Sequence, residues 1–256
     1  MSDFATAGGH WYKQDGSPFY TIIGKNGKER PVTLRDARPV GAVPSVTGII
    51  RCAAAPQLEK WKRNQILLSA LTLPHFPDET EDAWLARVEQ DWQEQGKTAA
   101  ERGTAIHAAI EQHYRQEIPP TELWDWVVAA KTEIAAQCGT WQWSAERSFA
   151  SPLGYGGKTD LHCLQWVIDV KTKDGDVTQD KMTTYDEHAM QAAAYRHGLG
   201  YQNARCAILF VGRDVPSAQL VELSEEDLSQ GWAMFKALLA YWQAKNKYAP
   251  GIALKP

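Results

Sequence analysis

Two aspartates and two lysines lie in the segment DLHCLQWVIDVKTK, on either side of a short apolar run. Asp160 and Asp169 are nine positions apart, and Lys171 and Lys173 follow the second aspartate. Charged side chains at the end of an apolar, strand-like run are costly to bury unless they are paired or bind a cation. The segment is therefore a candidate for a catalytic or metal-binding site.

A β-hairpin would bring the two aspartates together. If residues 158–163 and 166–172 pair through a loop of Leu164 and Gln165, Asp160 faces Asp169, with Cβ atoms about 5 Å apart. Strand alternation then separates two faces. The apolar face carries Leu161, Cys163, Trp166, Ile168 and Val170, and the other face carries Lys158, Asp160, His162, Val167, Asp169 and Lys171. Leu-Gln is a poor pair for a tight turn, so a longer loop with a shifted register stays open.

The charged face of this hairpin suits a metal-dependent hydrolase. Two aspartates held together repel each other, and a cation relieves that repulsion most directly. Carboxylate oxygens suit Mg²⁺ or Mn²⁺, and a histidine ligand is also compatible with Mn²⁺. Lys171 could orient or deprotonate water, or neutralise charge on a phosphate. On spacing alone, a solvated and salt-bridged sheet face is the competing interpretation.

Two helical segments carry further polar residues four positions apart. In ERGTAIHAAIEQHY, His107 and Glu111 share a helix face with Gly103, which permits the close approach of another backbone. In EHAMQAAAYRHG, Gln191 and Tyr195 share one face of an alanine-rich helix that can pack closely. Taken singly, each pair is also explained by an ordinary amphipathic helix.

These motifs follow one another in a fixed order along the chain. Arg-Gly-Thr-x-x-His-x-x-x-Glu comes first, followed by Gly-x-x-Asp, Asp-x-Lys and Gln-x-x-x-Tyr. The series resembles the RecB-like branch of the PD-(D/E)XK nuclease superfamily. PSVTGII, residues 44–50, is similar to the Pro-Ser-Val-Thr segment upstream in phage-type and mitochondrial genome maintenance exonucleases. The resemblance spans about residues 44–195 and depends on the order of five short motifs.

The resemblance implies a role for each matched residue in the catalytic centre. His107, Asp160 and Asp169 would be metal ligands, together with the backbone carbonyl of Val170. Lys171 would be the catalytic lysine that positions or activates the attacking water. A divalent cation, Mg²⁺ or Mn²⁺, is the implied cofactor.

Residues around this centre receive supporting roles from the same resemblance. Gln191 and Tyr195 would steady Lys171 or the scissile phosphate. Glu111 would support His107, and Glu146 would reach the site through a water, although an exposed strand acid explains Glu146 equally well.

Nucleic-acid contacts are implied for a further set of residues, Arg102, Ser45, Thr47, Lys158 and Lys173. The site histidine has two candidates. His162 lies on the charged hairpin face, but only His107 matches a motif of the family. We therefore expect His107 to be the ligand.

The chain is expected to form one α/β nuclease domain over residues 1–256, with a restriction-endonuclease-like core of a central mixed β-sheet flanked by helices. Periodicity predicts a β-rich segment over 1–50, a mainly helical part over 56–137, and a sheet core with a closing helix over 140–256. Helices are predicted over 56–71, 79–95, 98–116, 122–137 and 187–197, with a break near Gly96 and a capping box at Ser224 that begins the closing helix. Asn26-Gly27 predicts a hairpin.

Composition excludes several other classes of protein. A net charge of −4 argues against a protein that coats nucleic acid through charge alone. The four cysteines form no Cys-x-x-Cys pair, so we expect neither a structural zinc site nor the iron–sulfur cluster of some RecB-like nucleases. Neither a signal peptide nor a membrane span is recognisable, which favours the cytoplasm.

These observations predict a metal-dependent DNA nuclease, an exonuclease rather than an endonuclease, in phage or bacterial DNA recombination or repair. Its substrate would be single- or double-stranded DNA ends, and its protein partner a single-strand annealing protein or a helicase. One alternative is a non-catalytic DNA end-binding or recombination accessory module on the same fold. Another is a metal-dependent hydrolase of small nucleotides, which would need a closed pocket.

Overall fold

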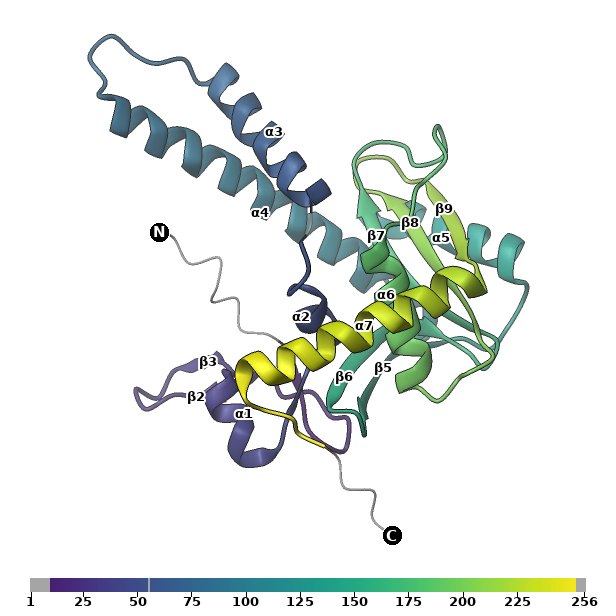
Figure 1. Cartoon of the computed structure of the whole chain (residues 1–256). Coiled ribbons are helices and arrows are strands. Elements are labelled where there is room, and N and C mark those ends of the chain that lie inside the picture. Colours follow the sequence, from purple (N-terminus) through teal and green to yellow (C-terminus); the bar gives the residue numbers. More distant parts are fainter. Residues whose placement is uncertain (1–9, 55, 252–256) are drawn as a thin grey trace.

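A five-stranded mixed sheet lies at the centre of the computed structural model, which describes residues 10–54 and 56–251 (Figure 1). Its strands, in spatial order, are β5 (Ser144–Ser151), β6 (Tyr155–His162), β7 (Trp166–Lys173), β8 (Arg205–Gly212) and β9 (Ala218–Leu223). Strands β7 and β8 are parallel, and the other neighbours are antiparallel. The prediction of a mixed α/β fold with a central mixed sheet is confirmed.

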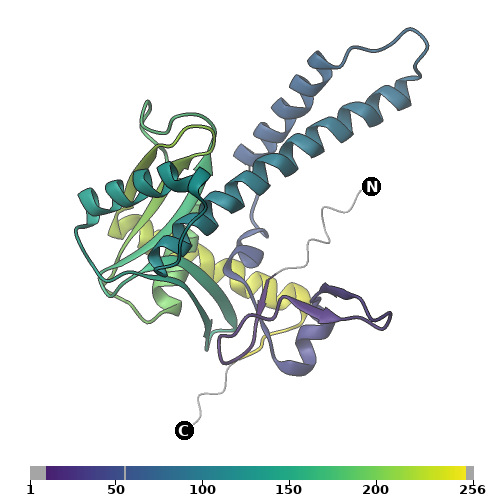
Figure 2. The ribbon, with the colours of Figure 1, turned by 180° about the vertical axis from the view of Figure 1, so that it is seen from behind.

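Helices cover both faces of this sheet (Figures 1 and 2). On one face lies α6 (Asp186–Gly198), the crossover between the parallel strands β7 and β8, and α7 (Glu225–Asn246) packs against it. On the other face lie the C-terminal part of α4 (Glu81–Tyr114) and α5 (Trp124–Cys138), which follows the short turn η1 (Thr121–Leu123). Strand β8 is buried from Cys206 to Gly212, as expected for a central strand covered on both sides.

The predicted hairpin of β6 and β7 has the expected register at its closed end. Leu161 pairs with Ile168 and His162 pairs with Val167, and the amide of Cys163 donates to the carbonyl of Trp166 at 2.9 Å. The apolar face packs into one core cluster with α4 and α5, as predicted. These pairs confirm the two-residue loop, which the turn chemistry of Leu-Gln did not favour.

The helical hairpin of α3 (Pro56–Thr72) and the N-terminal part of α4 extends away from the sheet (Figures 1 and 2). The predicted break near Gly96 is wrong, because α4 is continuous from Glu81 to Tyr114. A glycine inside a helix costs only about 1 kcal/mol relative to alanine. The good helix formers on either side and the packing of α3 outweigh that cost.

The N-terminal segment contains less strand than predicted. Two small sheets pair β1 (Trp11–Tyr12) with β4 (Val43–Pro44), and β2 (Thr21–Ile23) with β3 (Glu29–Pro31). The second pair confirms the hairpin at Asn26-Gly27. Two short helices, α1 (Leu34–Val40) and α2 (Val46–Ile50), occupy much of the remainder. Thr33 with Asp36 and then Ser45 supply the N-terminal caps that start these helices.

No helix in the described part of the chain combines the length and the apolarity that a membrane crossing requires. The capping box at Ser224 is confirmed, because its hydroxyl accepts from the amide of Asp227 at 3.0 Å.

Candidate active site

A hydrogen-bonded chain joins β7 to α6 around the side chain of Gln191. Its Nε2 donates to Asp169 Oδ1 at 2.7 Å and to Tyr195 Oη at 3.0 Å, while its Oε1 accepts from Lys171 Nζ at 3.1 Å. Lys171 Nζ also lies 2.7 Å from Asp169 Oδ2. Both ends of the amide are thus engaged, so Gln191 sets the positions of the carboxylate and the ammonium together.

A second group of side chains joins α4 to β6. Among the described residues, His107, Glu111 and Asp160 each offer one ligand atom, and these atoms lie within 4.8 Å of one another. His107 Nδ1 is 3.9 Å from Asp160 Oδ2. Close packing of α4 makes this approach feasible, because a Cβ at Gly103 would lie only 2.7 Å from Thr172 Oγ1. Gly103 thus permits a close approach, as predicted, but the group that approaches is the side chain of Thr172 and not a backbone.

A backbone amide of β7 also binds the Asp160 carboxylate. The amide of Val170 donates to Asp160 Oδ2 at 2.7 Å, which ties the carboxylate to the neighbouring strand. Metal ligation by the carbonyl of Val170 stays a prediction. So does ligation by Asp169, which lies outside the cluster of His107, Glu111 and Asp160.

The electrostatics of these groups fit a bound divalent cation. Burial, and then the charge of Asp169, raise the pKa of Asp160. Burial, and then the charge of Asp160, raise the pKa of Glu111. Asp169 Oδ2 is buried and pairs with the Lys171 ammonium at 2.7 Å. Asp160 and Asp169 thus lie close to each other and to Glu111, with Lys171 beside Asp169 and with Lys158 and Arg115 near Glu111. Imidazole with carboxylate oxygens is a donor set that Mg²⁺ or Mn²⁺ accepts.

Lys171 is held as an ammonium in this arrangement. Its burial acts to lower the pKa, but the carboxylates of Asp169 and Asp160 outweigh that effect and raise it. A protonated lysine donates hydrogen bonds and cannot accept a proton. From its position beside Asp169 and Gln191, this ammonium can orient a water molecule or stabilise negative charge.

Glu146 lies beside this centre in a strained backbone conformation. Its φ is +55°, and it falls between the ladder pairs Ala145–Leu161 and Arg147–Thr159. Its carboxylate forms ion pairs with Arg115 and Lys158. A residue other than glycine in the left-handed region of a strand is unusual and occurs often at functional sites. Its predicted link to the centre through a water stays a prediction.

The basic residues predicted to contact nucleic acid have different neighbours. Lys158 lines the cavity beside the centre, whereas Arg102 packs over the ring of Trp126, with 4.5 Å between its Cζ and the ring centroid. Lys173 is exposed and lies 6.0 Å from the ring centroid of Tyr185.

The two residues of the Pro-Ser-Val-Thr segment have a structural role. Ser45 is buried, and its hydroxyl accepts from the amide of Gly48 at 3.0 Å to cap α2. Thr47 Oγ1 lies 3.3 Å from Ser45 Oγ. The predicted phosphate contacts of both residues stay predictions.

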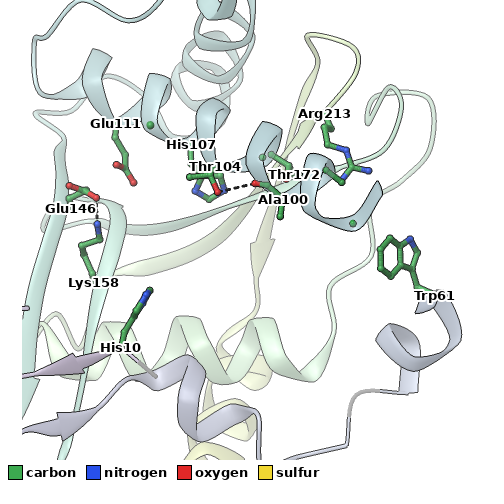
Figure 3. Close-up of a pocket in the computed structure, with 14 residues that line it drawn as sticks. His10, Trp61, Ala100, Thr104, His107, Glu111, Glu146, Lys158, Thr172 and Arg213 are labelled. Atoms are coloured by element: carbon green, nitrogen blue, oxygen red, sulfur yellow. Dashed lines mark hydrogen bonds and ion pairs between the residues drawn. The ribbon is translucent and has the colours of Figure 1, made fainter. Parts of the chain in front are cut away.

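An open cavity of about 760 Å³ borders the site (Figure 3). His107, Glu111, Glu146 and Lys158 lie on one side of it, and sequence reasoning had singled out all four. It had missed four further lining residues, namely His10, Trp61, Thr172 and Arg213. No local pattern marks them: Thr172 belongs to β7 and Arg213 follows β8, while His10 and Trp61 come from the N-terminal segment and α3, so only the tertiary packing brings them to one cavity.

The comparisons with known proteins do not identify a family for this chain. No family model matches the chain, and no curated protein matches it. A solved structure of a "Putative exonuclease" from Eubacterium rectale is similar, with a TM-score of 0.42 and 9% identity over 57% of this chain and 68% of that chain. The structure of SSO0001 gives a TM-score of 0.24 and 14% identity over 48% of this chain and 63% of that chain. The functional argument therefore rests on the site itself.

His107→Ala is expected to weaken Mn²⁺ binding by at least about 10- to 100-fold, because the loss of even a residue that only supports a ligand has an effect of that size. The matched variant His162→Phe should leave that affinity unchanged. His162 is buried beside Tyr201, and burial, followed by the charge of Arg147, lowers its pKa to about 4. Calorimetric titration of both variants with Mn²⁺ measures the difference, and the reverse order would transfer the ligand role to His162.

Proposed function

We propose that the protein is a metal-dependent DNA nuclease that hydrolyses phosphodiester bonds, acting as an exonuclease in phage or bacterial DNA recombination or repair. The observation that carries this proposal is the convergence of Lys171 with the carboxylates of Asp160 and Asp169 and the imidazole of His107. A salt-bridged sheet face without function needs no close pair of aspartates, and it needs no glutamine that holds a lysine in place.

The metal would be held by His107, Asp160 and Glu111, whose ligand atoms lie close together, and Asp169 and the backbone carbonyl of Val170 remain further ligands in this proposal. When bound, a divalent cation polarises a phosphoryl oxygen and lowers the pKa of a water molecule. Mg²⁺ and Mn²⁺ both suit these donors.

The chain's own residues orient the reacting groups. Lys171, fixed by Asp169 and Gln191, donates a hydrogen bond to the attacking water or to an oxygen of the phosphate. The water oxygen forms the new bond to phosphorus, and the bond to the leaving oxygen breaks. The proton of the water passes to solvent, and the leaving oxygen takes a proton from solvent.

The shape of the cavity supports a polymeric substrate. It is open, and its walls come from the N-terminal segment, α3, α4 and the sheet. A hydrolase of small nucleotides would enclose its substrate more completely. The retained lysine and carboxylates likewise argue against a non-catalytic end-binding module. A single-strand annealing protein or a helicase remains our proposal for the protein partner.

Linear DNA labelled at its ends and covalently closed circular DNA of the same sequence provide the test. In Mg²⁺ or Mn²⁺ we expect the linear substrate to be degraded and the circle to be spared, and EDTA should abolish the reaction. Cleavage of the circle would indicate an endonuclease. Hydrolysis of mononucleotide derivatives with intact DNA would favour the small-nucleotide alternative, and binding of ends without any hydrolysis would favour the accessory module.

A further inference from the structure

A second, smaller cavity adjoins the first on the outer part of α4. We call it the tryptophan pocket, and its volume is about 120 Å³. It lies where α3 passes α4 near the ends of β7 and β8, and its lining residues are Trp61, Gln65, Trp92, Gln95, Gly96, Ala99, Asp174 and Arg213. Trp61, Gly96, Ala99 and Arg213 line both cavities, so the two are contiguous.

The lining of the tryptophan pocket combines aromatic surface with polar groups. Trp61 comes from α3 and keeps 37% of its surface exposed, and Trp92 comes from α4. Side-chain amides of Gln65 and Gln95 offer both donors and acceptors. Indole rings stack on planar heterocycles, and amides bond to the polar edges of bases.

Arg213 lines the first cavity, where Figure 3 shows it, and it also lines the tryptophan pocket. It forms an ion pair with Asp174, and its side chain is 19% exposed. A fixed guanidinium is suited to a phosphate, and a carboxylate can accept from the amino group of a base. This pair therefore offers partners for the backbone as well as for the base of a nucleotide.

Gly96 contributes the space of the pocket. A Cβ built at this position meets nothing within 4 Å, so no neighbouring protein atom requires a glycine here. The residue nevertheless costs about 1 kcal/mol of helix stability relative to alanine. The room beside Gly96 is open to a ligand, and the whole pocket, at about 120 Å³, is somewhat smaller than a closed cavity of about 150 Å³ that accepts one benzene ring.

We propose that the tryptophan pocket binds one unpaired nucleobase of a DNA strand whose backbone continues to the candidate active site. This inference rests on the proposed function, because the strand is its substrate. From Gly96 to His107, α4 rises by roughly 16 Å, which corresponds to about five stacked nucleotides of one strand. A base held at that distance would fix the position of the strand over the site, whatever the sequence.

Binding of a fluorescently labelled single-stranded oligonucleotide in EDTA tests this inference without any cleavage. Trp61→Ala is expected to weaken binding by about 5- to 100-fold, the effect of losing one base–aromatic stack. Trp61→Phe, which keeps an aromatic ring, should stay within about 3-fold of wild type. Trp124→Ala, at an exposed tryptophan on α5 that lines neither cavity, is the matched control and should change nothing. Equal affinity of Trp61→Ala and wild type would overturn the inference.

An oligonucleotide series with one abasic residue at successive positions sharpens the test. Wild type should lose affinity at one or two adjacent positions, and Trp61→Ala should show no further loss there, because the stacking partner is already absent. If Trp61→Ala and the abasic residue reduce the binding free energy additively, the inference is wrong. In Gly96→Leu, the leucine side chain fills the pocket, so DNA binding should weaken. Leucine also has a better helix propensity than glycine, so the unfolding midpoint should not fall.

The two proposals can fail separately. A protein that binds one base through Trp61 but leaves DNA intact in Mg²⁺ or Mn²⁺ would contradict the nuclease proposal alone. One that degrades DNA while Trp61→Ala binds like wild type would contradict the pocket alone.

Discussion

Replacement of Lys171 by alanine is expected to lower the rate of DNA cleavage by about 100- to 10,000-fold, the range for a positioned proton donor or charge-stabilising group. The ammonium lies 2.7 Å from Asp169 Oδ2 and 3.1 Å from Gln191 Oε1, so its position depends on two fixed partners. Without it, neither the attacking water nor the phosphate has that donor. Single-turnover cleavage of labelled DNA measures the effect.

Stability must be followed in parallel, because Asp169 is buried and pairs with the lysine. Lys171→Ala leaves that carboxylate without its ammonium, which should lower the unfolding midpoint in EDTA. Lys171→Arg keeps the positive charge but replaces a compact ammonium by a planar fork, so it should restore stability and recover little activity. Near wild-type cleavage by Lys171→Ala would contradict the mechanism. Full activity of Lys171→Arg would show that the site needs only a positive charge at this position.

Replacement of Asp160 by asparagine is expected to have opposite effects on activity and on stability. The substitution removes a carboxylate from the cluster with His107 and Glu111, so Mn²⁺ affinity and metal-dependent cleavage should both fall by at least about 100-fold. In EDTA, the unfolding midpoint should instead rise by a few degrees. The raised pKa of Asp160 reflects burial and the nearby charge of Asp169, and a neutral amide avoids both costs.

The amide oxygen of asparagine can still accept from the amide of Val170, so the local backbone contact should survive. Calorimetric titration with Mn²⁺ and thermal unfolding in EDTA measure the two effects. Asp180→Asn, the same substitution at an exposed position, is the matched control and should change neither. Metal-stimulated cleavage by Asp160→Asn at the wild-type rate would refute its role as a ligand.

Sequence reasoning succeeded where the chemistry depends on neighbours along one element. Alternation of side chains placed Asp160 and Lys171 on the polar face of the hairpin, and the pairing of His162 with Val167 bears out the register at its closed end. The four-residue spacing put Gln191 and Tyr195 on one side of α6, where they bond to each other. The predicted helix break at Gly96 was wrong, because the low helix propensity of glycine was given more weight than the packing of α4 against α3.

The sequence by itself thus determined the inventory of the site: a hairpin with one polar face, a helix with His107, and a helix with Gln191. The tertiary structure decided which groups meet. Glu111 lies in the cluster with His107 and Asp160, and Asp169 instead joins Lys171 and Gln191. Periodicity describes directions within one element, whereas distances between elements depend on how closely they pack. Here, contacts such as that of Gly103 with Thr172 set those distances and gave the opening segment its partners.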